Sequence, residues 1–275
     1  MDQMRRARIF FIFLGAVLLD LAVITLLSRF GVPSQFFVWE FKFDLKPVLF
    51  AAICFVAAKR SALQFSPIKA DILHWDWGRS LLSFFSPIPL CGILIFAGLL
   101  SKGITYQGVD NPATFLLGVG IDIPAGFFFS ATVILLEEII FRDIVFLSLS
   151  SEDGFIVPAF MTSGLWGLLV YANSFDARQF SLVAGALGFI NLVSIGLVCS
   201  SLFYNSKSIW PGYSYRIGLA AFLTPILCGR QDDSNSFFIS NFPLFSNSGI
   251  AFSVLNFVFA AIILKLQKSS KNPLV

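Results

Sequence analysis

Long apolar runs separated by short polar stretches dominate this chain. A helix needs about 20 mainly apolar residues to cross the roughly 30 Å hydrocarbon core of a bilayer. Windows that approach this length lie at residues 9–28, 45–58, 81–100, 125–148, 155–172, 180–203, 208–227 and 248–264. The pattern predicts an all-α, polytopic integral membrane protein with about eight transmembrane helices, in which residues 1–275 form a single domain.

The composition agrees with this prediction and narrows the classes of function. Hydrophobic residues make up 57% of the 275 residues and charged residues only 13%, far from the balance of a soluble domain. A net charge of +3 is too small to indicate nucleic-acid binding. The cysteines at 54, 91, 199 and 228 show no Cys-x-x-Cys spacing, so the sequence predicts neither a disulfide framework nor a zinc knuckle. We expect no cofactor and no metal.

Basic residues gather at three places along the chain: before the first apolar window, between the second and third windows, and after the last window. Because cytoplasmic loops of membrane proteins carry an excess of Lys and Arg, this distribution predicts that both termini are cytoplasmic. The segment from His74 to Arg79 contains Trp75 and Trp77. Since indole rings favour the headgroup level, we expect an interfacial anchor there.

Three ionisable residues, Glu137, Glu138 and Arg142, interrupt the apolar window 125–148. A charge at membrane depth costs several kcal/mol unless it is paired or faces a wet cavity, so such residues are candidates for function. In an α-helix beginning near Asp122 and Pro124, Glu138 and Arg142 share one face as i and i+4. One glutamate could act as a general base for water, or the three could form a structural ion-pair cluster.

The run from Glu137 to Arg142 resembles the hallmark Glu-Glu-x-x-x-Arg of the CAAX-protease and bacteriocin-processing family of intramembrane endopeptidases. The resemblance extends over residues 115–225, which it marks as a CAAX-protease-like core. It implies that two further helices each supply a histidine, and that the group activates water against a peptide bond. It also makes a bacterial plasma membrane the preferred location.

The two histidines that the resemblance implies are absent from this chain. The segment from Ser163 to Val170 places Trp166 at the aromatic position of the second motif and Val170 at its histidine position. Arg216 stands at the second histidine position and Ala220 at the following asparagine position. The single histidine, His74, lies in a predicted interfacial loop and cannot replace two inward-facing imidazoles.

Arg216 cannot act as a base or bind a metal, but it can neutralise a carboxylate. If the windows 125–148 and 208–227 are neighbours, Glu137 and Glu138 face Arg142 and Arg216, two charges of each sign. Such a cluster would hold both carboxylates ionised as hydrogen-bond acceptors. We therefore interpret Glu137, Glu138 and Arg142 as a vestigial catalytic motif.

Three functions remain open at this point. The first is a non-catalytic member of the family that acts as a membrane scaffold or binds a membrane-protein partner. The second is an active glutamate-dependent endopeptidase acting on a peptide substrate without histidines, and the third is a small transporter. A transporter would need a continuous polar path on both sides of the charge cluster, and the external flank of the cluster looks too apolar. Another buried charge, Asp20, is expected to have a partner on another helix.

Overall fold

The protein is mainly helical in the computed structural model, which describes residues 3–30, 35–38, 41–60, 75–106, 133–150, 154–174, 182–228, 238–240 and 250–269. The helices outside the charged motif are α1 (Gln3–Arg29), α2 (Leu45–Arg60), α3 (Trp77–Phe85), α4 (Pro87–Leu100), α7 (Ile156–Ser174), α8 (Leu182–Ser206), α9 (Trp210–Ile226) and α10 (Ile250–Ser269). They coincide with the apolar windows of the sequence, because a helix satisfies every backbone hydrogen bond within its own segment.

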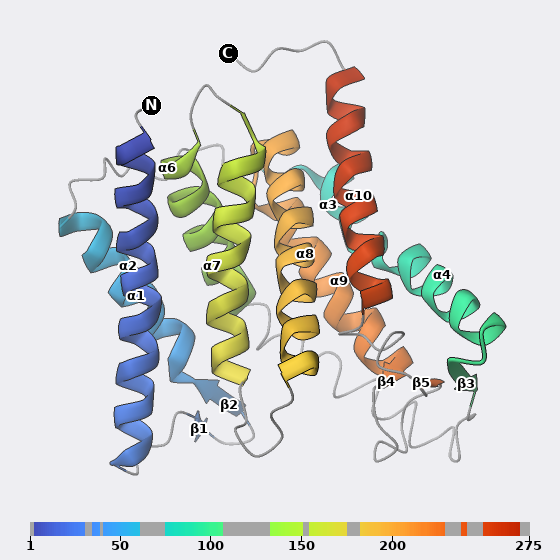
Figure 1. The fold of residues 1–275 in the computed structure, drawn as a ribbon, viewed down its shortest axis with the longest axis horizontal. Helices are drawn as coiled ribbons and strands as arrows, with labels where there is room; N and C mark the ends of the chain where they lie inside the picture. Colours follow the sequence, from blue (N-terminus) through green and yellow to red (C-terminus); the bar gives the residue numbers. More distant parts are fainter. Residues whose placement is uncertain are drawn as a thin grey trace.

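From α7 to α10, successive helices run in alternating directions between the two ends of the molecule (Figure 1). α7 descends from the end at which α1 begins, α8 returns to it, α9 descends again, and α10 finishes at that same end. In the described part of the chain, three helical stretches are long and apolar enough to cross a bilayer: Ala7–Leu27, Trp77–Leu100 and Gly185–Ser206. Ile156–Tyr171 and Ile250–Leu266 are shorter apolar helices.

The predicted window 81–100 lies within the apolar stretch Trp77–Leu100, which the chain divides into α3 and α4, two helices that meet at Ser86. The cause lies in Pro87, which has no N–H to donate to the carbonyl of Ser83. The Ser86 hydroxyl donates to that carbonyl instead, at 2.7 Å. The Phe84 carbonyl oxygen faces Gly218 of α9, where an added Cβ would lie only 2.1 Å from it. The joint between α3 and α4 is therefore packed closely on α9.

Short strands, which were not predicted, occur in the segments that connect the helices. β1 (Gln35–Val38) and β2 (Phe41–Asp44) form an antiparallel hairpin in which Gln35 pairs with Asp44. β3 (Ile104–Tyr106) pairs antiparallel with β5 (Phe238–Ser240), and β5 pairs in parallel with β4 (Leu227–Cys228). All these strands lie at the end opposite the start of α1 (Figure 1). The apolar windows could not predict them, because they belong to the segments between helices.

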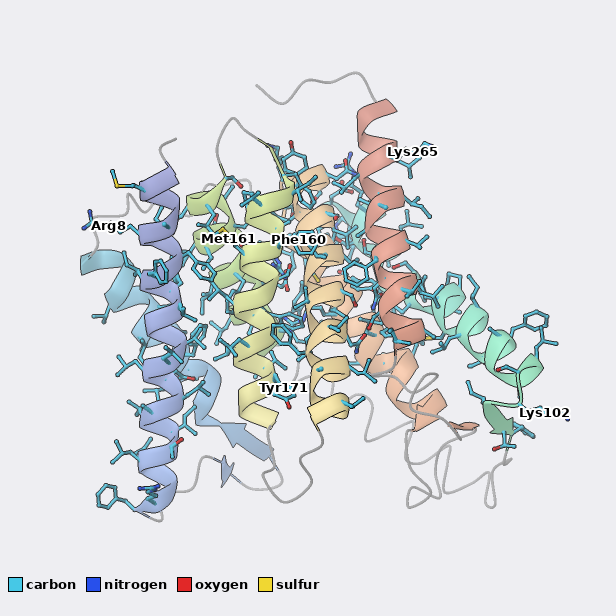
Figure 2. The ribbon with its side chains drawn as sticks, viewed as in Figure 1. Arg8, Lys102, Phe160, Met161, Tyr171 and Lys265 are labelled. Atoms are coloured by element: carbon cyan, nitrogen blue, oxygen red, sulfur yellow. The ribbon has the colours of Figure 1, made fainter. Side chains whose placement is uncertain are left out.

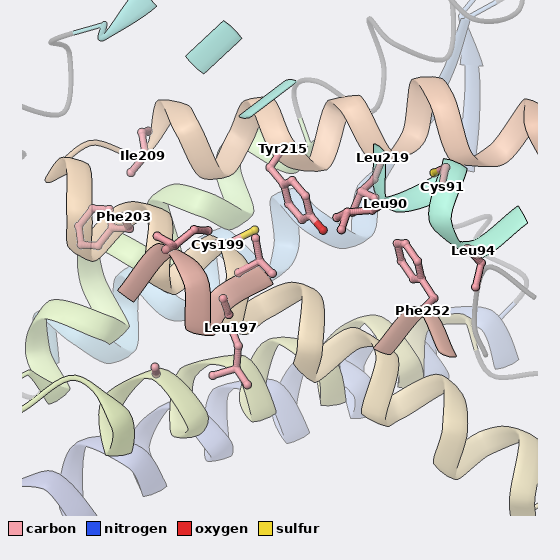
Figure 3. Packing of buried hydrophobic residues seen from close by; sticks show 14 of the residues in the cluster. Leu90, Cys91, Leu94, Leu197, Cys199, Phe203, Ile209, Tyr215, Leu219 and Phe252 are labelled. Carbon is pink, nitrogen blue, oxygen red and sulfur yellow. The ribbon is translucent and has the colours of Figure 1, made fainter. Parts of the chain in front are cut away.

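The core consists of two apolar clusters. One joins α4, α8, α9 and α10 and includes Leu90, Phe203, Tyr215 and Phe252 (Figure 3). The other joins α1, α2, α7 and the charged helix, and its members include Phe13, Phe50, Phe141 and Trp166. Helices α7 and α8 connect the two clusters.

Small residues bring α7 and α8 close together. A Cβ added to Gly196 would lie 2.8 Å from the Cβ of Ser163, and one added to Gly167 would lie 3.3 Å from Val193. Small residues at such contacts are typical of helix packing in membranes, where close backbone approach replaces the hydrophobic effect.

Candidate functional site

The helix that carries the charged motif changes type at the motif. Residues 133–138 are α-helical, residues Ile139–Phe146 form the π-helix η2, and a last turn, α6 (Leu147–Leu149), completes the segment. A continuous α-helix was predicted, so this part of the prediction is wrong. A π-helix closes its hydrogen bonds from residue i to i+5, and such segments are frequent at functional sites. Asp122 and Pro124, the predicted helix start, lie outside the described residues.

Arg142 is completely buried within this helix. Its Nε lies 3.4 Å from Oε2 of Glu138, one helical turn earlier, so the predicted i and i+4 pair is confirmed despite the change of helix type. Its Nη1 donates to the Ser200 hydroxyl of α8 at 3.0 Å. Arg142 therefore ties the charged helix to α8 as well as pairing within its own helix. The next residue, Asp143, is half-buried.

Arg216 reaches both glutamates from α9. Its Nη2 lies 2.5 Å from Oε2 of Glu137, and its Nη1 lies 3.1 Å from Oε1 of Glu138. The exposed fraction of the Arg216 side chain is only 11%, and that of Glu138 is 1%. The prediction that the windows 125–148 and 208–227 are neighbours is thus confirmed. So is the prediction that two carboxylates meet two guanidinium groups.

Trp166 of α7 closes another side of the cluster. Its indole Nε1 donates to Oε2 of Glu137 at 2.8 Å, the same oxygen that accepts from Arg216. The guanidinium carbon of Arg216 lies 4.6 Å from the centre of the Trp166 ring, within the range of a cation–π contact. Trp166 thus contacts a carboxylate and a guanidinium of the cluster at once.

Glu138 lies against the first turn of α9. A Cβ added to Gly212 would lie 2.9 Å from Oε2 of Glu138, so only glycine leaves room for the carboxylate at this distance. The N-terminal end of a helix carries a partial positive charge and unpaired N–H groups, which favour an anion nearby. Cys199 of α8 packs on the same turn, with its Sγ 3.7 Å from the Gly212 carbonyl oxygen. The site is therefore enclosed by α7, α8, α9 and the charged helix.

The remaining residues predicted for the site lie apart from these contacts. Val170, at the first histidine position, is half-buried and packs against the apolar cluster of α1, α2 and α7. Ala220, at the asparagine position, is exposed. His74 lies outside the described residues. Asp20 of α1 is completely buried, and its partner on another helix stays a prediction.

Sequence reasoning missed two sets of polar residues. One is Ser200, the α8 partner of Arg142. The other is a hydrogen-bonded group made of Asn191, Ser194, Tyr215, Ser253 and Asn256, which joins α8, α9 and α10. The signal was available, because asparagines inside apolar windows are as informative as charges there. Their partners could not be named, since they come from other helices.

Chemically, the arrangement is a closed, charge-balanced cluster. The carboxylate oxygens accept from two arginines and an indole, all of them donors only. Among the residues that the structure describes, no group of three His, Cys, Asp or Glu side chains could hold a metal ion. The cluster links α7, α9 and the charged helix through charge-assisted hydrogen bonds.

Comparison with known proteins identifies the segment that builds this site. Residues 119–222 match the family model described as type II CAAX prenyl endopeptidase Rce1-like. This range contains both glutamates, both arginines and Trp166, and it lies inside the range 115–225 over which the sequence resembles CAAX proteases. No curated protein and no solved structure matches the chain. The apolar helices and the family-model match together show a helical integral membrane protein in which residues 119–222 are similar to Rce1-like type II CAAX prenyl endopeptidases.

Proposed function

We propose that this protein is a non-catalytic member of the Rce1-like family whose former catalytic centre holds a membrane scaffold together. The observation that carries the proposal is the position of Arg216. It occupies a histidine position of the family motif and lies within hydrogen-bond distance of both Glu137 and Glu138. The chain thus replaces a group that can exchange a proton with one that cannot.

The chemistry of the cluster supports this proposal. A general base must accept a proton from water, and it must be within hydrogen-bond reach of that water. Glu138 is buried and accepts from Arg142 and Arg216 on its two oxygens. Glu137 accepts from Arg216 and Trp166. Use of either carboxylate as a general base would break a buried ion pair.

A comparison of the wild type with Glu138→Gln tests the proposal. Both proteins are purified in mild detergent and incubated with a farnesylated peptide that ends in a CAAX sequence, and release of the terminal tripeptide is followed by mass spectrometry. We expect no release above the Glu138→Gln background. Release by the wild type that Glu138→Gln abolishes, with expression and folding unchanged, would instead support an active glutamate-dependent endopeptidase.

The partner-binding part of the proposal needs a separate test. The wild type and Arg216→His are each purified from native membrane, and the proteins that co-purify with them are compared. If the polar centre serves a scaffold, the variant loses both thermal stability and its co-purifying protein. Arg216→His still lacks a histidine at position 170, so we expect no proteolysis from it. Proteolysis by this variant would indicate recent descent from an active enzyme.

The proposed topology places both termini in the cytoplasm of a bacterial cell, with the protein in the plasma membrane. Arg8, near the start of α1, and Lys265, near the end of α10, lie toward the same end of the molecule, which supports a shared side for the two termini (Figure 2). Cysteine labelling of residues 8 and 265 in sealed, right-side-out vesicles tests this. Labelling of either position by a membrane-impermeant maleimide would contradict the topology.

A further inference from the structure

A second polar centre lies beside the ion-pair cluster, between α8, α9 and α10. The Tyr215 hydroxyl of α9 donates to Oδ1 of Asn256 on α10, and Nδ2 of Asn256 donates to the Ser194 hydroxyl of α8 at 3.2 Å. Ser194 in turn donates to the Asn191 carbonyl, and the Ser253 hydroxyl donates to Oδ1 of Asn191 at 3.4 Å. The exposed fraction of every one of these side chains is 7% or less.

The sequence did not predict this hydrogen-bonded group, because the apolar windows beside the charge cluster contain few polar residues. Buried amide and hydroxyl groups are costly when they lose their partners, so a satisfied network fixes the helices that carry it. Here the network fixes α10 against both α8 and α9. The opposite face of α10 is an apolar stripe of Ile250, Val254, Val258, Ile262 and Leu266, spaced four residues apart and exposed.

α9 presents a different face to each of its neighbours. Gly212 and Arg216, one turn apart, face the glutamates. Tyr215 faces α10, while Gly218 contacts the α3–α4 joint. Consecutive residues of a helix point about 100° apart, so the direction of Tyr215 sets that of Arg216. A small rotation of α9 would move Arg216 away from one or both carboxylates.

We propose that Tyr215, Asn256 and Ser194 form a latch that fixes the rotation of α9 and so keeps Arg216 on Glu137 and Glu138. α10 is then the element through which a change at the lipid-facing surface reaches the ion-pair cluster. Releasing the latch loosens the contact between α8 and α9 where Cys199 meets Gly212. The latch is a positioning device, and its role does not depend on whether the site is catalytic.

Cys199 provides a direct reporter of this contact. It is completely buried, and its Sγ packs on the first turn of α9. In a background with the other three cysteines replaced by alanine, alkylation of Cys199 by N-ethylmaleimide is timed in detergent micelles. Tyr215→Phe removes only the hydroxyl, and we expect it to speed alkylation several-fold. Asn256→Leu should act in the same direction.

Ser201→Ala is the matched control, because the Ser201 hydroxyl is buried in α8 and, among the described residues, donates to the Leu197 carbonyl of its own helix. It should leave the alkylation rate unchanged. An unchanged rate in Tyr215→Phe would overturn the latch. An equal increase in Ser201→Ala would also overturn it, since the effect would then be general loosening of α8.

A second measurement distinguishes an effect of Tyr215 on the position of Arg216 from a purely local contribution of the Tyr215 hydroxyl to stability. The apparent Tm is measured for Tyr215→Phe, for Arg216→Gln and for the double variant. If the latch positions Arg216, part of the cost of Tyr215→Phe arises through the ion pairs, so the loss in the double variant is smaller than the sum of the single losses. Additive losses would contradict the proposal.

Discussion

The guanidinium group of Arg216 lies over the indole ring of Trp166, 4.6 Å from its centre, while the N–H of that ring donates to Glu137 at 2.8 Å. The tryptophan therefore contacts both the carboxylate and the guanidinium of one ion pair. The sequence resemblance assigns Trp166 to the aromatic position of the second motif, and in the structure this residue is part of the charged cluster.

Two substitutions separate these roles of Trp166. Trp166→Phe removes the hydrogen bond to a carboxylate but keeps a ring under Arg216, so we expect a loss of about 1.5–3 kcal/mol in the free energy of unfolding. Trp166→Leu also removes the cation–π contact and should cost about 0.5–2 kcal/mol more. Chemical denaturation in detergent measures both. Equal losses would show that the ring contributes nothing to holding Arg216.

Gly218 of α9 should not tolerate a side chain, because a Cβ there would lie 2.1 Å from the Phe84 carbonyl oxygen. We expect Gly218→Ala to lower the free energy of unfolding by about 1–3 kcal/mol, since backbone cannot move aside as a flexible side chain can. The control is Gly188→Ala in α8, where a Cβ meets nothing within 4 Å.

Alanine at position 188 should be neutral or stabilising by about 0.5–1 kcal/mol, because glycine is a poor helix former. Thermal unfolding of the two variants side by side makes the comparison. If Gly218→Ala is as stable as Gly188→Ala, the described packing of the α3–α4 joint on α9 is wrong.

Much of the helical framework could be predicted from the sequence, for a physical reason. Apolar segments in lipid must satisfy their own backbone, so windows such as 155–172 and 180–203 become helices, here α7 and α8. The pairing of Glu138 with Arg142 also followed from spacing alone. The break before Pro87 could have been predicted too, since proline inside a helix removes a backbone donor.

Other features depend on contacts between distant parts of the chain. The contact of Arg216 with both glutamates was predictable only through the family resemblance, which indicated that their helices are neighbours. Neither the sequence pattern nor the family resemblance predicted the π-helix at Ile139–Phe146 or the hydrogen bond between Tyr215 and Asn256. Each of these features depends on how several helices pack. A sequence window reports the environment of a segment, but it does not name the partner on another helix.

Ser200 should support the cluster through Arg142. Its buried hydroxyl accepts from Nη1 of Arg142 at 3.0 Å, so Ser200→Ala leaves a buried guanidinium N–H without that partner. We expect a loss of about 1.5–3 kcal/mol, the range for hydrogen bonds to charged groups. The neighbouring Ser201→Ala removes a hydroxyl of the same size whose hydrogen bond lies within α8, and it should cost less. Thermal unfolding in detergent compares the two variants, and equal losses would remove Ser200 from the cluster.

We expect Arg216 to neutralise the glutamate pair, and a cycle of charge-removing substitutions measures this effect. Arg216→Gln leaves two carboxylates with Arg142 alone, so we expect a loss of about 3–5 kcal/mol in the free energy of unfolding. Adding Glu137→Gln restores the balance, because Glu138 and Arg142 remain paired at 3.4 Å. We expect Glu137→Gln/Arg216→Gln to be more stable than Arg216→Gln alone. A double variant that is no more stable than Arg216→Gln would contradict the neutralising role of Arg216.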